Sequence, residues 1–305
     1  MTNIRIIPRL DIKGPNVVKG IQFDGFRVLG SAEMFAEIYY SEGADEVIFQ
    51  DTVASLYQRD VDLEVVKRVA RKLSIPLTVA GGIRTTDNIR NVLRAGADKV
   101  AINTGAVANP NFLQEAVKMY GSQCIVSSIE AHRHPNGTFE LWTDYGRQPT
   151  GIDAYEWAKK VVELGVGEIM LTSIDREGSG RGYDVEMVSR FATTLPVPII
   201  ACGGAGSKDD FVAVAKQGSA DAVSASSVFH HFYANAGHEA VSLQGRYKLR
   251  MGAELDSGNV DFLQQGYGGF TKLLVKPTSI LEAKTVMRGA RLMVRIQSNG
   301  KQSHV

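Results

Sequence analysis

Two Gly-Gly pairs are the residues of this chain whose type and spacing most clearly suit chemistry. Gly81-Gly82 lies in PLTVAGGIRTT and Gly203-Gly204 in PIIACGGAGSK, each between an apolar run and a polar helix start. Glycine allows the backbone to approach an anion closely, and a helix N-terminus presents N–H donors and the positive end of a dipole. Small polar residues follow the next apolar run in each case, Asn103-Thr104 and Ser226-Ser227. Either pair alone could form only a tight turn, but both together favour two phosphate sites.

The glycine pairs belong to an internal repeat. The segment GADKVAINTGA at 96–106 aligns with GSADAVSASSV at 218–228 when one inserted residue is allowed. All βα units share glycine and apolar patterning, but a nearly ungapped match over about 30 residues favours duplication. We therefore expect two half-barrels, at about 1–122 and 123–230.

Acidic residues also occupy matching places in the two halves. Asp11, near the end of the first apolar run, matches Glu130 at the end of the fifth, and Asp51 in FQDTVAS matches Asp175 in TSIDREGS. Asp11 could be a simple strand-end cap, but an acid in an apolar strand at the catalytic face of a barrel favours a functional role. Two opposite phosphate corners would fit an elongated ligand with a phosphate at each end.

Eight short apolar runs alternate with amphipathic segments along the chain. The runs are continuous, as in parallel strands that are covered on both faces. They lie at 4–12, 46–51, 77–82, 99–103, 124–130, 168–173, 198–204 and 221–227. The helical segments start at caps such as Ser31, Asp153 and Ser207, and several close at Gly43, Gly96, Gly165 and Gly218. This order predicts a single-domain (β/α)8 TIM barrel over residues 1–305, and the repeat argues against an open doubly wound sheet.

Composition excludes several classes of protein. The net charge of +1 gives no electrostatic case for nucleic acid or an acidic membrane surface as a partner. Cys124 and Cys202 both sit in apolar runs, which indicates reduced core residues and a cytoplasmic location. We expect neither a signal peptide nor a membrane span.

Several motifs together resemble the cyclase subunit of imidazole glycerol phosphate synthase, an enzyme of histidine biosynthesis. They are PRLDIKGPNVVKG, VAGGIR, GADKVAINT, GSQCIV, LTSIDREGSGRGYD and IACGGAG, and the resemblance covers residues 4–230 and resumes near the C-terminus. It implies a (β/α)8 barrel supplied with ammonia by a separate glutaminase subunit in a heterodimer. The substrate would be a bis-phosphorylated formimino aminoimidazole carboxamide ribonucleotide, and no cofactor would be needed.

The resemblance also implies roles for individual residues. Two carboxyls act as general acid and base, at the positions of Asp11 and Glu130. Lys19, in VVKG, would be a mobile-loop lysine near a phosphate. The substrate and phosphate contacts would come from the remaining positions: Asp51, Gly82, Asn103, Thr104, Glu177, Gly178, Gly203, Gly204, Ser226 and Ser227.

Three positions depart from the family pattern. Glu130 and Glu177 are each one methylene longer than the usual aspartate, and Arg9 replaces a small residue. A carboxylate displaced by about 1 Å can cost about 100-fold in rate. The unperturbed pKa of glutamate is nevertheless within about half a unit of that of aspartate, so the type of chemistry could survive with a changed substrate.

Four charged residues each stand at the start of a strand, on the face opposite the active site. They are Arg5, Glu46, Lys99 and Glu168. In the family such a quartet gates the entrance for ammonia. A ring of salt bridges that only plugs the barrel is the alternative, since this face usually serves stability.

An insertion is expected after the eighth strand. Residues 231–277 separate that strand from a final helix at 278–293, where Ser279 and Glu282 could form a capping box. The insertion contains enough apolar residues to favour a packed lid or a subunit contact: Phe262, Leu263, Phe270, Leu273 and Leu274. His230, His231 and His238 lack metal-ligand spacing, so no metal site is expected.

Four functions remain open from the sequence. The first is the ammonia-using cyclase/lyase. A divergent paralogue that delivers ammonia to another substrate, such as a surface-polysaccharide sugar nucleotide, would account for Glu130, Glu177 and Arg9. A non-catalytic phospholigand-binding barrel would leave Asp11 unexplained. The preceding isomerase of the histidine pathway would share both phosphate corners but not the four-charge quartet.

Overall fold

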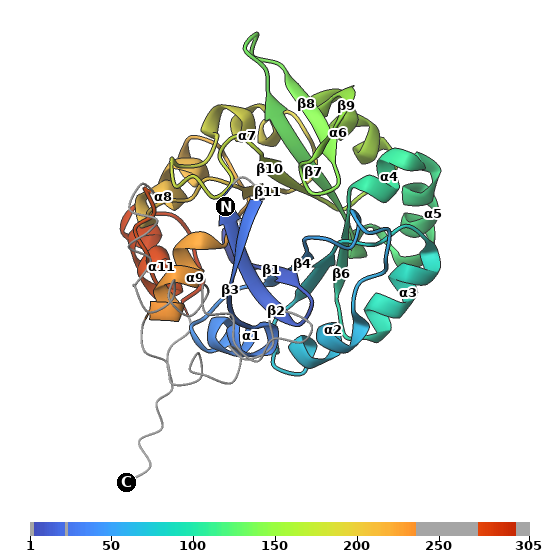
Figure 1. Ribbon diagram of the computed structural model, residues 1–305. Helices are drawn as coiled ribbons and strands as arrows, with labels where there is room; N and C mark the ends of the chain where they lie inside the picture. The colour runs from blue at the N-terminus through green and yellow to red at the C-terminus, as the bar shows by residue number, and fades with distance from the viewer. Residues whose placement is uncertain (1–2, 22–23, 236–273, 297–305) are drawn as a thin grey trace.

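The computed structural model describes residues 3–21, 24–235 and 274–296. Eight parallel strands close into a barrel with helices around it (Figure 1), which confirms the (β/α)8 fold. The barrel strands are β1 (Arg5–Lys13), β4 (Val47–Asp51), β5 (Leu77–Ala80), β6 (Lys99–Ile102), β7 (Ile125–Arg133), β10 (Glu168–Ser173), β11 (Ile199–Cys202) and β12 (Ala222–Ala225). Closure is made by β1, which pairs with both β12 and β4.

The outer layer is helical. Its helices are α1 (Ala32–Ser41), α2 (Leu63–Ala70), α3 (Thr86–Arg94), α4 (Thr104–Ala108), α5 (Pro110–Tyr120), α6 (Ala154–Glu163), α7 (Val185–Ala192), α8 (Lys208–Lys216), α9 (Ser227–Asn235) and α11 (Ile280–Gly289). One short 3-10 turn, η1 (Ser122–Cys124), precedes β7.

The barrel strands are buried on both faces, which explains their continuous apolar sequences. Ile7 belongs to a cluster inside the barrel, with Ile48, Val126 and Met170. Its neighbour Ile6 belongs to the larger core between the strands and the helices. Burial of both faces makes most positions of such a strand apolar, and the exceptions Asp11 and Glu130 lie toward the carboxyl ends of β1 and β7.

Two antiparallel hairpins extend the barrel and were not predicted. Strand β1 continues into β2 (Asn16–Ile21) and β3 (Asp24–Ser31), while β7 continues into β8 (Phe139–Thr143) and β9 (Gln148–Asp153). Each hairpin follows the first strand of a predicted half-barrel, so both predicted halves contain a hairpin at the same place. Both hairpins start from strands that carry a predicted catalytic acid.

Most of the predicted helix ends agree with the structure. Asp153 accepts hydrogen bonds from the next helix, and Ser279 forms a capping box with Glu282. Gly218 is an exception, because the left-handed residue at this turn is Ser219, with φ of 56°. Cys202 is buried as expected, but Cys124 is only partly buried.

The predicted insertion lies mainly outside the described residues. Residues 236–273, with Phe262, Leu263, Phe270, Leu273 and His238, are not described, whereas α9 continues to Asn235 and takes in the first residues assigned to the insertion. Leu274 is 61% exposed. None of the helices within the described ranges is long and apolar enough to cross a membrane.

Candidate functional site

The first corner is the group of residues around Gly82, Asn103 and Thr104 at the carboxyl ends of β5 and β6. A small pocket lies there, and it is also lined by Asp51 and Glu130. Gly81 and Gly82 have φ of 98° and 70°. A Cβ at Gly81 would lie 2.5 Å from the carbonyl oxygen of Asp51, so the close backbone approach requires glycine.

The second corner is formed by Glu177, Gly178, Gly203, Gly204, Ser226 and Ser227, at the carboxyl ends of β11 and β12. These residues and Arg9 line a second, small pocket. Gly204 has φ of 108°, and a Cβ there would lie 2.2 Å from the carbonyl oxygen of Gly182. The structure therefore brings together the residues of each predicted corner.

Asp51 lies at the edge of the first corner. Its carboxylate accepts hydrogen bonds from the backbone N–H groups of Val53 and Ala54 and forms an ion pair with Arg59 at 2.9 Å. Burial raises its pKa above the ordinary value despite these contacts. These contacts bind the loop that follows β4 to the Asp51 carboxylate.

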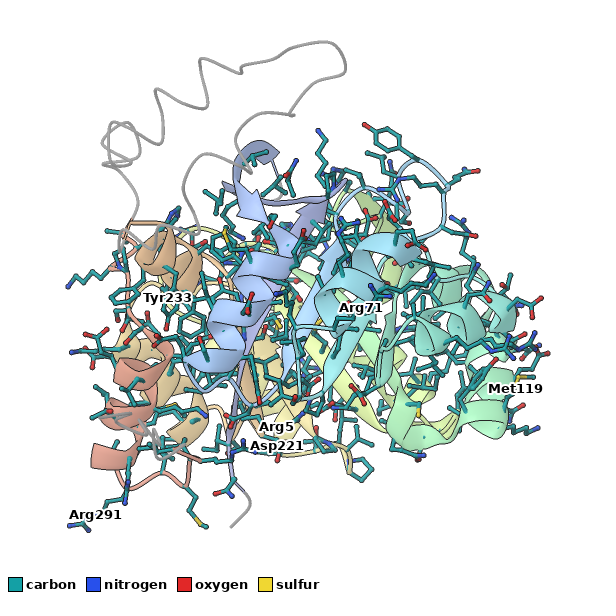
Figure 2. All side chains as sticks on the ribbon, turned by 90° about the horizontal axis from the view of Figure 1, so that it is seen from below. Arg5, Arg71, Met119, Asp221, Tyr233 and Arg291 are labelled. Atoms are coloured by element: carbon teal, nitrogen blue, oxygen red, sulfur yellow. The ribbon has the colours of Figure 1, made fainter. Side chains whose placement is uncertain are left out.

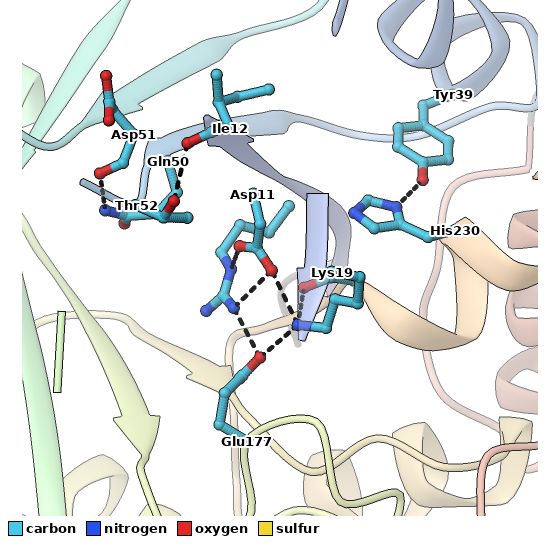
Figure 3. A network of polar contacts seen from close by, with 11 residues as sticks. Asp11, Ile12, Lys19, Tyr39, Gln50, Asp51, Thr52, Glu177 and His230 are labelled. Carbon is cyan, nitrogen blue, oxygen red and sulfur yellow. Dashed lines mark hydrogen bonds and ion pairs between the residues drawn. The ribbon is translucent and has the colours of Figure 1, made fainter. Parts of the chain in front are cut away.

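Four buried charges form an ionic cluster next to the second corner. Asp11 binds Arg9 Nε at 2.7 Å and Lys19 Nζ at 2.8 Å, and both cations also contact Glu177, at 2.8 and 2.7 Å. Figure 3 shows Asp11, Lys19 and Glu177 converging on one another. The cluster carries two positive and two negative charges. It is therefore neutral, as burial requires.

The two cations decide the protonation of Asp11. Burial by itself would raise its pKa, but Arg9 and Lys19 outweigh this and hold the pKa well below its usual range. The pKa of Glu177 is lowered too, since the same two cations overcome the effect of burial. Both side chains are therefore carboxylates throughout the physiological pH range.

Lys19 is placed differently from the prediction. It is not on a mobile loop but within strand β2, where it is 7% exposed. Its ammonium also lies 3.4 Å from Ser226 Oγ. The antiparallel return of β2 along β1 brings it next to Asp11, and two carboxylates compensate its burial.

Glu130 lies across the barrel from Asp11, because β7 and β1 are separated by three strands in either direction around the ring. Its Oε2 accepts from Asn103 Nδ2 at 2.9 Å and from the Gly146 N–H at 2.8 Å. Burial raises its pKa from 4.5 to about 7, although both hydrogen bonds favour the ionised form. Oε1 has no hydrogen bond to a described residue, and Glu130 lines the first corner. The two predicted acids therefore lie on opposite strands with very different proton affinities.

A turn that was not predicted to be functional covers the first corner. It is the tip of the β8–β9 hairpin, where Asp144 and Tyr145 have φ of 53° and 58°. The Asp144 N–H donates to Thr104 Oγ1 at 3.0 Å, and the buried Tyr145 side chain hydrogen-bonds Asp11. The sequence signal was present, since an Asp-Tyr-Gly turn between short alternating runs is typical of a hairpin.

The four charges at the opposite end of the barrel form a closed ring. Arg5 contacts Glu46 at 2.7 Å and also contacts Glu168, while Lys99 lies 3.0 Å from each of the same two carboxylates. Arg5 marks this end of the barrel in Figure 2. Each charge thus has two neighbours of the opposite sign, as the sequence led us to expect.

Of the histidines near the end of the barrel, His230 lies within the described residues and His238 lies outside them. His230 is fully buried in α9, where its Nδ1 contacts the Tyr39 hydroxyl (Figure 3) and burial lowers its pKa to about 3. Among the residues that the structure describes, no three His, Cys, Asp or Glu side chains are grouped to hold a metal ion.

Comparison with known proteins gives concordant matches. The family described as "Histidine biosynthesis protein" matches residues 5–234, which include all eight barrel strands. The imidazole glycerol phosphate synthase subunit HisF of Legionella pneumophila is 50% identical over 211 residues, which are 69% of this chain and the whole of that relative. The protein of the same name from Streptomyces griseus subsp. griseus is 48% identical over 227 residues, 74% of this chain and 90% of the relative.

Proposed function

This chain belongs to the histidine biosynthesis protein family, and from this premise we propose that it is the cyclase subunit of an imidazole glycerol phosphate synthase. In the proposed reaction, ammonia and a bis-phosphorylated formimino aminoimidazole carboxamide ribonucleotide give imidazole glycerol phosphate and aminoimidazole carboxamide ribonucleotide. The enzyme would act as a lyase in the cytoplasm. The observation that carries the proposal is a pair of glycine corners at one barrel mouth, each with a carboxylate from the opposite strands β1 and β7 beside it.

The two corners would hold the two phosphates of the substrate. Thr104 and the backbone at Gly82 would bind one, and Ser226, Ser227 and the backbone at Gly204 the other. Lys19 would contribute a positive charge to the second site from its place beside Ser226. Fixing both ends of an elongated molecule would bring its reacting centre between Asp11 and Glu130, and such positioning contributes directly to rate.

The different proton affinities of the two acids support different roles for them. Glu130, with a pKa of about 7, can carry a proton near neutrality and deliver it. Asp11 would be the ionised partner, and it is a weak base while Arg9 and Lys19 contact it. A general acid is most effective when its pKa lies near the operating pH. Environments that push the pKa values of two carboxyls apart are the usual means of separating acid from base.

Ammonia would enter at the other end of the barrel. The names of both relatives describe a subunit, and a glutaminase is the partner that we propose for this chain. The ring of Arg5, Glu46, Lys99 and Glu168 would be the gate through which ammonia passes. We also propose that residues 1–305 are one domain, with half-barrels at about 1–122 and 123–230.

Turnover with added ammonia tests the proposal without the partner. The purified protein, an ammonium salt and the bis-phosphorylated ribonucleotide should give both products, and the Asp11→Asn variant should not. Formation of product by the Asp11→Asn variant at the same rate, or no product from the unmodified protein, would reject it. The comparisons do not favour the divergent paralogue, and a parallel assay for ammonia-independent isomerisation separates the isomerase alternative.

A further inference from the structure

We propose that Arg9 is an anion-binding residue of the second corner, where it holds one phosphate of the substrate. This inference takes one element from the proposed function, namely that a phosphate binds in the second corner. It concerns a residue that neither the glycine pattern nor the internal repeat identifies. Arg9 lines the cavity of the second corner together with Gly204, Ser226 and Ser227.

The hydrogen bonds of Arg9 leave one side of its guanidinium for a ligand. The side chain is 3% exposed, Nε donates to Asp11, and Nη2 donates to Asp11 and Glu177. Nη1 donates to none of the residues that the structure describes. Arginine carries five N–H donors in a fixed fork that matches the oxygens of a phosphate. A guanidinium nitrogen that lines a pocket and has no hydrogen-bond acceptor among the described residues is suited to an anion that enters the pocket.

The charges around Arg9 favour the same conclusion. Lys19, Asp11 and Glu177 alone would sum to one negative charge, and they would repel a phosphate. Arg9 brings the cluster to neutrality. Its guanidinium is fully buried, so its field is screened much less than that of an exposed arginine. A phosphate in the second corner could then contact Arg9 without competing with an uncompensated carboxylate.

The internal repeat supplies a matched comparison within the chain. Arg9 precedes Asp11 by two positions, and Ser128 precedes Glu130 by two positions in the other half. Ser128 lines the first corner as Arg9 lines the second, and it is 3% exposed with an Oγ that has no hydrogen-bond partner among the described residues. The cation of the first corner is instead Arg84, which is 35% exposed and paired with Asp60. Only the second corner therefore has a buried guanidinium in its wall.

The test is binding of inorganic phosphate to four forms of the intact protein. They are the unmodified chain, Arg9→Ser, the double variant Arg9→Ser/Glu177→Gln, and Ser128→Ala as the matched control. Titration calorimetry gives the affinities, and crystals soaked at graded phosphate concentrations show which corner is filled. The double variant keeps the cluster neutral, so it distinguishes a direct contact between Arg9 and phosphate from an effect of charge balance. It also provides a protein without Arg9 if Arg9→Ser alone does not fold.

We expect both variants that lack Arg9 to bind phosphate in the second corner about 10- to 100-fold more weakly, as for loss of a hydrogen bond to a charged group. Ser128→Ala should leave the affinity of that corner unchanged. Affinity restored to that of the unmodified chain in the double variant would overturn the proposal, since Arg9 would then only neutralise Glu177. Ammonia-dependent turnover of the unmodified chain is measured separately, so failure of this inference is distinguished from failure of the proposed function.

Discussion

Replacing Glu130 with glutamine tests the most unusual electrostatic feature of the site. Glutamine has the same shape, and its carbonyl oxygen can accept the bonds from Asn103 and Gly146. It cannot exchange a proton. Burial raises the pKa of Glu130 from 4.5 to about 7, and each pKa unit corresponds to about 1.4 kcal/mol. The buried carboxylate therefore costs about 3 kcal/mol of folding free energy at alkaline pH relative to its protonated form.

The sign of the pH effect follows from the direction of the shift. The folded state binds the proton more tightly than the unfolded state, so this contribution is fully present below pH 4.5 and is lost as the pH rises through about 7. The free energy of unfolding of the unmodified protein should fall across this window relative to that of Glu130→Gln. Urea denaturation at several pH values measures the difference between the two proteins, which cancels the other titrating groups.

The pH dependence of turnover should also report the protonation of Glu130. With free ammonia held constant, turnover by the unmodified protein should decline above an apparent pKa near 7, because Glu130 loses the proton that it delivers. The pH profile of Glu130→Gln should lack this decline, and the variant should lose most of the activity. On the proposed substrate, Glu130→Asp restores the usual aspartate and should preserve or raise turnover, whereas a loss of about ten-fold or more would indicate a pocket fitted to the longer side chain and a changed substrate. Equal turnover by all three proteins, with parallel stability curves, would refute both the pKa argument and the catalytic role.

Three further predictions follow from the same geometry. Asp11→Asn leaves two buried cations facing Glu177 alone, so it should abolish turnover and lower the free energy of unfolding by about 3–5 kcal/mol, measured in urea; an active, equally stable variant would contradict this. Crystals soaked in sulfate should show density in both corners, and two empty corners would count against the phosphate sites. Lys99→Met opens the four-charge ring and should change the ratio of glutamine-driven to ammonia-driven turnover, whereas an unchanged ratio would leave the ring a purely structural plug.

The barrel strands could be predicted because their physical situation is simple. A strand covered on both faces is mostly apolar, and all eight predicted runs form strands in the structure. The hairpins were missed because they follow a different rule. In β8 the residues alternate between buried and half-buried, with Phe139, Leu141 and Thr143 inward. This period of two marks a strand with one covered face, and a search for continuous apolar runs passes over it.

The ionic cluster could be predicted only in part. Sequence alone identifies Arg9 and Glu177 as departures from a family pattern, but it does not show that their side chains contact each other at 2.8 Å. Lys19 and Glu177 are 158 positions apart, and no local periodicity reveals their pairing or their burial. The four-charge ring was easier to predict. Arg5, Lys99 and Glu168 are the first residues of their strands and Glu46 directly precedes β4, and parallel strands align their first residues at one end of a barrel.

The way β1 closes the barrel has a consequence for synthesis of the chain. Its first residues pair with β12 and its later residues with β4, so the earliest strand to be made is completed by the latest. Roughly 120 residues separate the ends of β6 and β12, and a ribosome adding about 5–20 residues per second needs roughly 6 to 24 s to make them. During that interval the edge of β1 that will pair with β12 stays open, while the opposite open edge moves from β6 to β7, β10 and β11 as each strand is made. The predicted half-barrel repeat would let a neighbouring nascent chain offer these edges a competing partner. Domain-swapped dimers should therefore form most readily on crowded polysomes, before closure within one chain is possible.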